Sequence, residues 1–252
     1  MSFAVPADAY ARFMGRFSEP LAVAFADFAG VEAGQSVLDV GSGPGALTTV
    51  LVDRLGAGAV AAVEPSPPFV DALTARLPDV DVRAASAEDL PFADDTFDGT
   101  LAELVVHFMT DPVAGLREMA RVTRPGGVVA ACVWDHDGGR SPLSTCWRAA
   151  TEIAPDVVDE AGLPGAREGH LEQLCAAAGL QDVESTVLSV EVVFDDFEEW
   201  WQPYTNGAGP LGAYIKGLDE PARQALRDRC AELLLPAPFP IRGSAWTVRA
   251  RA

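Results

Sequence analysis

The sequence predicts an α/β fold in which a mainly parallel sheet is covered by helices on both faces. Over residues 37–134, short apolar runs typical of buried strands alternate with stretches that have the apolar periodicity of helices. A glycine-rich turn separates the first apolar run from the helix that follows it. Chains that alternate strand and helix in this way form parallel sheets between two helical layers.

The predicted elements follow one another in a regular order up to residue 134. The first strand is predicted at residues 37–40, before the turn Gly41–Gly45 and a helix that starts at Ala46. Further strands are predicted at 59–63, 80–84, 97–102, 127–134, 186–194 and 244–250, and further helices at 68–77, 112–122, 145–153 and 166–178. Residues 195–240 are helical and turn-rich, so we expect an insertion between the last two strands that folds over the sheet.

Composition indicates a globular chain and argues against two classes of partner. Its 252 residues, 49% of them hydrophobic, are enough for one large domain or for a domain with a cap. The formal net charge of -19 at pH 7 would repel a phosphate backbone, so we expect no nucleic-acid partner. The start of the chain lacks a signal-peptide pattern and no apolar run is long enough to span a bilayer, so we expect no membrane partner.

The four cysteines indicate a reducing compartment. Cys132, Cys146, Cys175 and Cys230 lie far apart and lack both the CxxC spacing of zinc sites and the density of a disulfide framework. We therefore expect a cytoplasmic protein without a metal site, whose cysteines fill the core.

The turn in VLDVGSGPGALT, residues 37–48, predicts that the backbone approaches a ligand closely. Gly41, Gly43 and Ala46 fit the GxGxxA pattern that places a dinucleotide pyrophosphate at a helix N-terminus. The same residues also suit other ligands, or a strand-to-helix turn without a ligand. The pattern alone therefore leaves the ligand open.

Three further motifs narrow the choice of ligand. VLDVGSGPG at 37–45 is followed by Glu64 at the end of the second strand, AEDLPF and DTFD within 87–98, and REMARVTRPGG at 117–127. In this order and spacing, residues 35–135 resemble the class I S-adenosylmethionine (SAM) dependent methyltransferases. In particular, they resemble the small-molecule branch that includes the ubiquinone and menaquinone C-methyltransferases, the methyltransferase type 11 family.

This resemblance implies a more detailed fold. It implies a Rossmann-like, doubly wound, seven-stranded mixed sheet of strand order 3-2-1-4-5-7-6, with a helical cap. The chain would then have four parts. These are an N-terminal helical lid at residues 1–33, a SAM-binding core at 34–194, a cap insertion at 195–242 and the final core strand at 243–252.

The resemblance also implies a cofactor site for SAM, which carries a sulfonium and an ammonium group but no phosphate. Asp39 would lie near the ammonium group, and the Glu64 carboxylate would accept hydrogen bonds from both ribose hydroxyls. An alternative for Glu64 is a solvated acid at a strand end. The full set of expected cofactor-binding residues is Asp39, Gly41, Ser42, Gly43, Gly45, Glu64, Pro65, Ser66, Ala87, Glu88 and Leu104.

One histidine is the candidate general base. His107 follows the fourth strand, at the edge where open α/β sheets bind ligands, and an imidazole suits proton transfer near neutral pH. Its neighbours are apolar, so a histidine packed for structural reasons is an equal alternative. His136 and His170 have weaker claims, because the first begins a polar loop and the second lies within a predicted helix.

Aromatic residues outside the core motifs are the candidates for an acceptor pocket. Apolar rings with polar handles suit a flat or hydrophobic small molecule. Packing between the cap and the core would explain the tryptophans of the insertion equally well. The expected pocket residues are Tyr10, Phe13, Trp134, Trp200, Trp201 and Tyr204.

These expectations together predict methyl transfer from SAM to a small-molecule acceptor by in-line displacement. Since the sulfonium is already a good leaving group, catalysis would rest mainly on positioning and desolvation. Two alternatives stay open. One is a non-catalytic SAM-binding or regulatory protein, and the other is an NAD-type oxidoreductase, for which no Ser/Tyr/Lys catalytic grouping is found.

Overall fold

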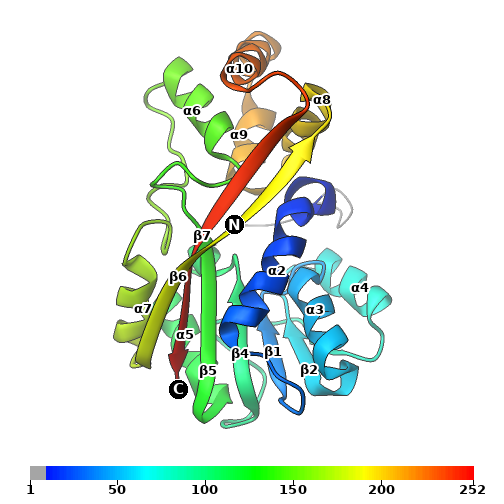
Figure 1. The fold of residues 1–252 in the computed structure, drawn as a ribbon, viewed down its shortest axis with the longest axis vertical. Helices are drawn as coiled ribbons and strands as arrows, with labels where there is room; N and C mark the ends of the chain where they lie inside the picture. The colour runs from blue at the N-terminus through cyan, green and yellow to red at the C-terminus, as the bar shows by residue number, and fades with distance from the viewer. Residues whose placement is uncertain (1–9) are drawn as a thin grey trace.

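The computed structural model describes residues 10–252, which form one seven-stranded sheet flanked by helices (Figure 1). The strand order is β3-β2-β1-β4-β5-β7-β6, as predicted. Strands β1 to β5 pair in parallel, whereas β7 runs antiparallel to both β5 and β6. The strands are β1 (Val37–Val40), β2 (Val60–Val63), β3 (Asp81–Arg83), β4 (Phe97–Glu103), β5 (Thr123–Trp134), β6 (Gln181–Phe194) and β7 (Phe239–Arg251).

Helices cover both faces of the sheet because successive side chains of each strand point to opposite faces. In β1, Val37 belongs to one hydrophobic cluster and Leu38 to the other. The first cluster packs under α2 (Arg16–Ala29), α3 (Ala46–Leu55) and α4 (Pro67–Arg76), and the second under α5 (Pro112–Val122) and α7 (His170–Ala178). The buried strands thus have the double-sided apolar pattern that the sequence predicts for a parallel sheet.

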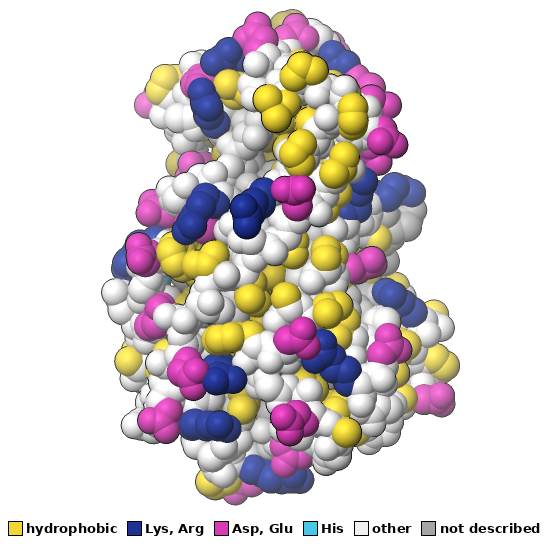
Figure 2. All heavy atoms as spheres, in the orientation of Figure 1, with side chains coloured by type: hydrophobic (Ala, Val, Ile, Leu, Met, Phe, Trp, Pro, Cys, Tyr) yellow, Lys and Arg dark blue, Asp and Glu magenta, His cyan; other side chains and the backbone are white. Residues whose placement is uncertain are grey.

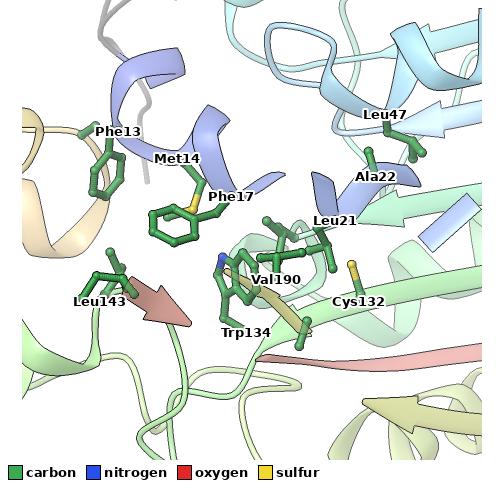
Figure 3. Close-up of a cluster of buried hydrophobic side chains, with 14 of the residues drawn as sticks. Phe13, Met14, Phe17, Leu21, Ala22, Leu47, Cys132, Trp134, Leu143 and Val190 are labelled. Carbon is green, nitrogen blue, oxygen red and sulfur yellow. The ribbon is translucent and has the colours of Figure 1, made fainter. Parts of the chain in front are cut away.

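The described part of the N-terminal segment lies against the sheet. After the short η1 turn (Ala11–Gly15), α2 buries Phe17, Leu21 and Phe25 against the strands. Figure 3 shows Met14 and Phe17 next to Trp134, with Leu21 beside Val190. Of the lid predicted at residues 1–33, residues 1–9 lie outside the described part, and α2 is a layer of the core.

A cap of five short helices surrounds the far end of the β6–β7 pair (Figure 1). Four of them come from the predicted insertion. The fifth, α6, comes from the segment after β5 and packs on α10. The cap helices are α6 (Ser144–Ile153), α8 (Phe197–Trp201), η4 (Gln202–Asn206), α9 (Gly209–Gly217) and α10 (Glu220–Leu233).

Three of the element starts that differ from the predicted ones do so for identifiable reasons. Helix α7 begins at His170, four residues later than predicted, because Gly165 and Gly169 have positive φ values of 78° and 72° and form turns. Strands β6 and β7 start five residues early, because each extends as long as the other offers antiparallel partners. None of the helices described is long and apolar enough to cross a membrane.

Charged side chains of both signs alternate over the face that carries α2 and β6 (Figure 2). Several form ion pairs between elements, such as Arg16 with Glu199, Arg54 with Asp27 and Arg249 with Glu184. The first of these joins α2 to the cap helix α8. Each exposed ion pair of this kind contributes little to stability. The first hydrophobic cluster, which includes residues of the sheet, α2 and the cap, therefore holds the cap against the sheet.

Candidate functional site

A cavity of about 310 Å³ opens at the carboxyl ends of β1, β2 and β4. This is the edge at which open α/β sheets bind ligands. Nine of the eleven predicted cofactor residues line it: Asp39, Gly41, Ser42, Gly43, Glu64, Pro65, Ala87, Glu88 and Leu104. The other two, Gly45 and Ser66, do not line the cavity themselves but adjoin lining residues in the sequence.

Two glycines of the β1–α3 turn have different roles. Both have positive φ values, 54° at Gly43 and 97° at Gly45. A Cβ atom on Gly45 would lie 2.5 Å from Leu73 Cδ1, so this glycine lets α3 and α4 pack closely. A Cβ atom on Gly43 would meet no protein atom within 4 Å, because Gly43 lines the cavity. A side chain at position 43 would therefore project into the cavity, whereas one at position 45 would clash with α4.

The Glu64 carboxylate is fixed by two backbone donors. Its Oε2 accepts the Gly43 N–H at 2.8 Å and its Oε1 accepts the Ser66 N–H at 2.8 Å. Burial raises the pKa of Glu64, and these two hydrogen bonds partly oppose that rise. Each oxygen keeps a lone pair for a ligand hydroxyl. Ser66 does not line the cavity itself, but its N–H helps to orient the Glu64 carboxylate.

Two further acids follow the same sheet edge. Asp39 is almost fully buried, and its Oδ2 accepts a 2.5 Å hydrogen bond from the Thr48 hydroxyl. Burial, helped by the charge of Glu64 and opposed by the Thr48 bond, raises the pKa of Asp39 to about 7. Burial and the neighbouring Asp39 raise the pKa of Glu103 well above its usual value, and Glu103 Oε1 has no hydrogen-bond partner.

The cavity is therefore acidic. Asp39, Glu64 and Glu103 stand at the ends of three adjacent strands. Among the described residues that line the cavity, Arg76 is the single Arg or Lys. Such a site favours a cationic ligand over an anionic one. Glu103 has no role in the sequence-based site, although an acid at the end of a third neighbouring strand is a signal that could have identified it.

Glu88 has a supporting role in the cavity wall. Its Oε1 accepts the N–H groups of Thr110 and Asp111, at 2.8 and 3.3 Å. These bonds tie the segment after β3 to the residues that start α5. Ala87, which is buried beside Glu88, offers an apolar surface to the same cavity.

Leu104 adopts an uncommon backbone conformation at the end of β4. Its φ is 60°, in the left-handed region that non-glycine residues seldom occupy. Its N–H still donates to the Cys132 carbonyl at 2.9 Å, so the strand pairing holds the conformation in place. Leu104 lines this cavity and also a second, smaller one. Strained residues of this kind concentrate at ligand sites.

The second cavity, of about 30 Å³, adjoins the first and shares Tyr10, Leu104 and Phe108 with it. His107 lines it and is nearly fully buried on the η3 turn (Val106–Phe108). Burial, with a smaller effect of His136, lowers the pKa of His107 well below its usual value. The other residues that line it are Phe13, Met14, Trp134, His136, Leu143, Glu160, Ala208, Gly209, Pro210 and Leu211.

Three of the six predicted acceptor residues line a cavity and three do not. Tyr10, Phe13 and Trp134 line the second cavity, and Tyr10 also lines the first. Trp200 and Trp201 are buried in the cap and line neither cavity. Tyr204 is buried with them, 5.4 Å from Phe13 between ring centroids. His136 and Glu160, which do line the second cavity, are absent from the sequence-based site.

Comparison with known proteins identifies the part of the chain that carries the first cavity. A family model described as a methyltransferase domain matches residues 38–131, from β1 into β5. Residues 38–131 thus match the methyltransferase domain in sequence. The order of motifs in the sequence predicts this family, and the match confirms it. Within residues 10–252, no group of three or more His, Cys, Asp or Glu side chains is arranged to hold a metal ion.

Similar proteins extend this comparison. The chain is 42% identical over 103 residues to an uncharacterized methyltransferase of Mycobacterium tuberculosis, covering 41% of each chain. It is 43% identical over 113 residues to a demethylmenaquinone methyltransferase of a Mycobacterium species, covering 44% of this chain and 47% of the relative. These matches span less than half the length of the relatives.

The fold as a whole also has counterparts among solved structures. A geranyl diphosphate C-methyltransferase from Streptomyces coelicolor, in complex with Mg²⁺, geranyl diphosphate and S-adenosylhomocysteine, is similar with a TM-score of 0.55. The similarity covers 94% of this chain and 80% of that one at 15% identity. At this identity the similarity concerns the fold.

Proposed function

We propose that this protein transfers a methyl group from SAM to a small-molecule acceptor. The observation that carries the proposal is the acidic first cavity, built within a methyltransferase domain around the Glu64 carboxylate. The similar Streptomyces coelicolor structure holds the demethylated product of SAM, which supports the same ligand here.

The residues of the first cavity fit SAM. Glu64 offers one lone pair on each oxygen to a pair of ribose hydroxyls. The carboxyls of Asp39 and Glu103 would face the ammonium and sulfonium groups, and a bound cation would lower their raised pKa values and so favour their charged forms. When bound, SAM would supply a methyl group activated by its sulfonium.

A dinucleotide fits the same cavity poorly. Its pyrophosphate would need the free N–H groups of the glycine turn. The Gly43 N–H is already donated to Glu64, and the carboxylate itself would repel a phosphate placed there. An NAD-type oxidoreductase is therefore the weaker alternative, as the missing Ser/Tyr/Lys grouping also indicates.

The chain's own contribution to the reaction would be positioning and desolvation. Holding two reactants in line can supply about 7–11 kcal/mol of the barrier. The apolar wall of Leu104, Phe108 and Met109 would exclude water from the reacting atoms. His107, kept neutral by its lowered pKa, could take a proton from an acceptor that must lose one.

The acceptor is proposed to be a small and largely apolar molecule. The second cavity has a mainly apolar lining and adjoins the first. Relatives named demethylmenaquinone methyltransferases agree with an acceptor of this general kind.

Titration calorimetry tests the cofactor assignment. We expect SAM and S-adenosylhomocysteine to bind with micromolar affinity and NAD not to bind. NAD binding in place of SAM would contradict the proposal. A screen of metabolite extracts with SAM, read by mass spectrometry for products heavier by one methylene, then separates an enzyme from a non-catalytic SAM-binding protein.

A further inference from the structure

Two buried histidines with unpartnered nitrogens meet at the second cavity. His107 Nδ1 and both ring nitrogens of His136 are buried and have no hydrogen-bond partner. Their ring centroids are 6.0 Å apart, and the two rings do not hydrogen-bond to each other. Buried polar atoms are normally paired, so unpaired ones at a cavity indicate a ligand that supplies the missing partners.

The backbone holds both rings firmly at this place. His136 lies in a turn after β5, in which Asp135 accepts the Gly138 N–H at 2.8 Å and pairs with Arg140. His107 lies in the η3 turn after β4, closed by the bond from the Phe108 N–H to the Val105 carbonyl. Since β4 and β5 are adjacent and parallel, both turns lie at the same edge of the sheet.

The rest of the lining indicates the charge of the ligand. No Lys or Arg is among the described residues that line the second cavity, so it offers no ion pair to a carboxylate or a phosphate. Its one acid, Glu160, accepts the Trp147 indole N–H at 2.7 Å, and burial raises the pKa of Glu160 to about 7. Phe13, Met14, Trp134 and Leu143, all labelled in Figure 3, are among the apolar residues of the lining. The lining therefore suits an uncharged group with one polar atom, and at about 30 Å³ the second cavity takes this end of a ligand while the apolar body extends beyond it.

The second cavity also has the right position relative to the first. Tyr10, Leu104 and Phe108 line both cavities, so a molecule in one is separated from the other by side chains alone. A group held by His107 and His136 would therefore approach the first cavity from the cap side.

We propose that the second cavity is the acceptor subsite, and that His107 and His136 together hold a hydroxyl group of an uncharged acceptor, which is the group to be methylated. This inference rests on the proposed function. One imidazole accepts the hydroxyl proton and the other donates to the oxygen, which satisfies nitrogens that have no other partner.

The electrostatics of the pair agree with this role. Burial lowers the pKa of both rings, that of His136 to about 4, even though Asp159 and Asp135 act to raise the latter. Both imidazoles are therefore neutral at pH 7, and each has one donor and one acceptor nitrogen. In the transfer, the hydroxyl proton passes to an imidazole nitrogen and the oxygen forms a bond to the methyl carbon. The carbon–sulfur bond breaks, and its electron pair stays on sulfur.

A binding experiment tests this subsite without requiring the natural acceptor. The full chain, labelled with ¹⁵N in its histidines and saturated with S-adenosylhomocysteine, is titrated with phenol as the probe. Anisole, which has the same ring but no hydroxyl proton, is the matched control ligand, and benzoate is the charged one. We expect phenol to shift the ring signals of His107 and His136 but not those of His170, and to bind at least about tenfold more tightly than anisole or benzoate.

Two variants sharpen the result. His136→Leu should remove the preference for phenol over anisole, whereas His136→Gln, which can still donate and accept, should keep part of it. His170→Leu is the control, because His170 lies on α7 and lines neither cavity. Binding of S-adenosylhomocysteine should stay within about twofold in all three, since none of these residues lines the first cavity.

The outcomes separate the two proposals. Failure of S-adenosylhomocysteine to bind would overturn the proposed function. If it binds but phenol leaves both histidine signals unmoved, or binds no better than anisole, the acceptor subsite is refuted and the methyltransferase proposal stands. The wild-type comparison of phenol with anisole decides the matter even if a variant does not fold.

Discussion

The two cavities differ in how most of their polar side chains are satisfied, although Ser42 Oγ and Glu103 Oε1 of the first cavity also have no partner. In the first, Glu64 is bonded to Gly43 and Ser66, and Asp39 is bonded to Thr48. In the second, His107 Nδ1 and both ring nitrogens of His136 have no partner. A site whose key groups are already oriented binds one ligand with little reorganisation, which suits a donor common to many enzymes. A site with unsatisfied groups depends on the partner that completes it, which suits an acceptor that differs between enzymes.

Of the changes that test this difference between the cavities, we expect the largest loss of SAM affinity from filling the first cavity. Gly43→Val should weaken binding of SAM by about 100-fold or more, because its side chain would occupy ligand space that no protein atom uses. The positive φ adds a modest loss of stability. Calorimetry measures the binding, and circular dichroism checks the fold. Unchanged affinity in a folded variant would mean that the turn is only structural.

The next effect tests the carboxylate that the turn holds. Glu64→Ala should weaken SAM binding by about 1.5–3 kcal/mol, since charge-assisted hydrogen bonds are lost and the Gly43 N–H is released. Glu64→Gln is the matched control and should lose less, because its amide oxygen still accepts one backbone bond. Equal SAM dissociation constants for Glu64→Ala and the wild type would show that the ribose does not lie here.

A pH effect distinguishes the acidic first cavity from the neutral second one. Because the pKa of Asp39 is raised to about 7, Asp39 gains its charge between about pH 6 and pH 8. Affinity for cationic SAM should therefore rise by about fivefold to tenfold over that range, and Asp39→Asn should flatten the rise. Phenol binding at the second cavity should not follow this curve. Calorimetry at several pH values measures both, and a flat SAM profile in the wild type would argue against Asp39 as the cation's partner.

The same shift has a consequence for stability. A carboxyl whose pKa is raised on folding binds its proton more tightly in the folded than in the unfolded chain. Its contribution to the free energy of unfolding is therefore present below about pH 4 and is lost as the pH rises towards 7. Asp39→Asn should accordingly raise the melting temperature at pH 8 in the absence of ligand. A lower melting temperature at that pH would indicate that the Thr48 bond outweighs burial.

The smallest effect on ligand binding is expected in the cap core. Trp200→Phe should lower the free energy of unfolding by about 1–2 kcal/mol, because Trp200 is fully buried, but leave affinity for S-adenosylhomocysteine within about twofold. Trp134→Phe is the matched control, since Trp134 is equally buried but lines the second cavity. Chemical denaturation and calorimetry give the two quantities. A large loss of cofactor affinity in Trp200→Phe would make the cap part of the cofactor site.

Much of the fold and of the first cavity could be predicted from the sequence. Asp39 and Glu64 lie at one sheet edge, as expected from parallel strands that bring their carboxyl ends together, and their binding of a cofactor stays a prediction. Tyr10, Phe13, His107 and Trp134 of the second cavity were expected at a site, but most of its other residues could not be found in this way. The lining residues come from segments as far apart as Phe13, His136 and Leu211, and only the packing of the cap on the sheet brings them together.

The tryptophans of the cap illustrate the limit of local patterns. Trp200 and Trp201 have the apolar faces expected of an acceptor pocket, and the same faces suit a hydrophobic core. In the structure they pack on each other and on Phe197 and Tyr204. The cap helices continue the first hydrophobic cluster beyond the sheet and need apolar residues for it, which a sequence pattern does not distinguish from a ligand pocket. Whether these side chains also contact an acceptor remains a prediction.

The long β6–β7 pair determines how the cap can move. The two strands pass without a break from the sheet into the cap, where Val190, Val192 and Phe194 still pair with Gly243, Ile241 and Phe239. Figure 1 shows this two-stranded ribbon extending from the sheet to the cap helices. A ribbon of two hydrogen-bonded strands resists a sharp bend, because the bend would break the hydrogen bonds between the strands. It twists about its long axis more easily. The cap would thus rotate relative to the sheet about the long axis of the β6–β7 ribbon. A small twist of the ribbon near the sheet would become a larger displacement at the outer wall of the cavities.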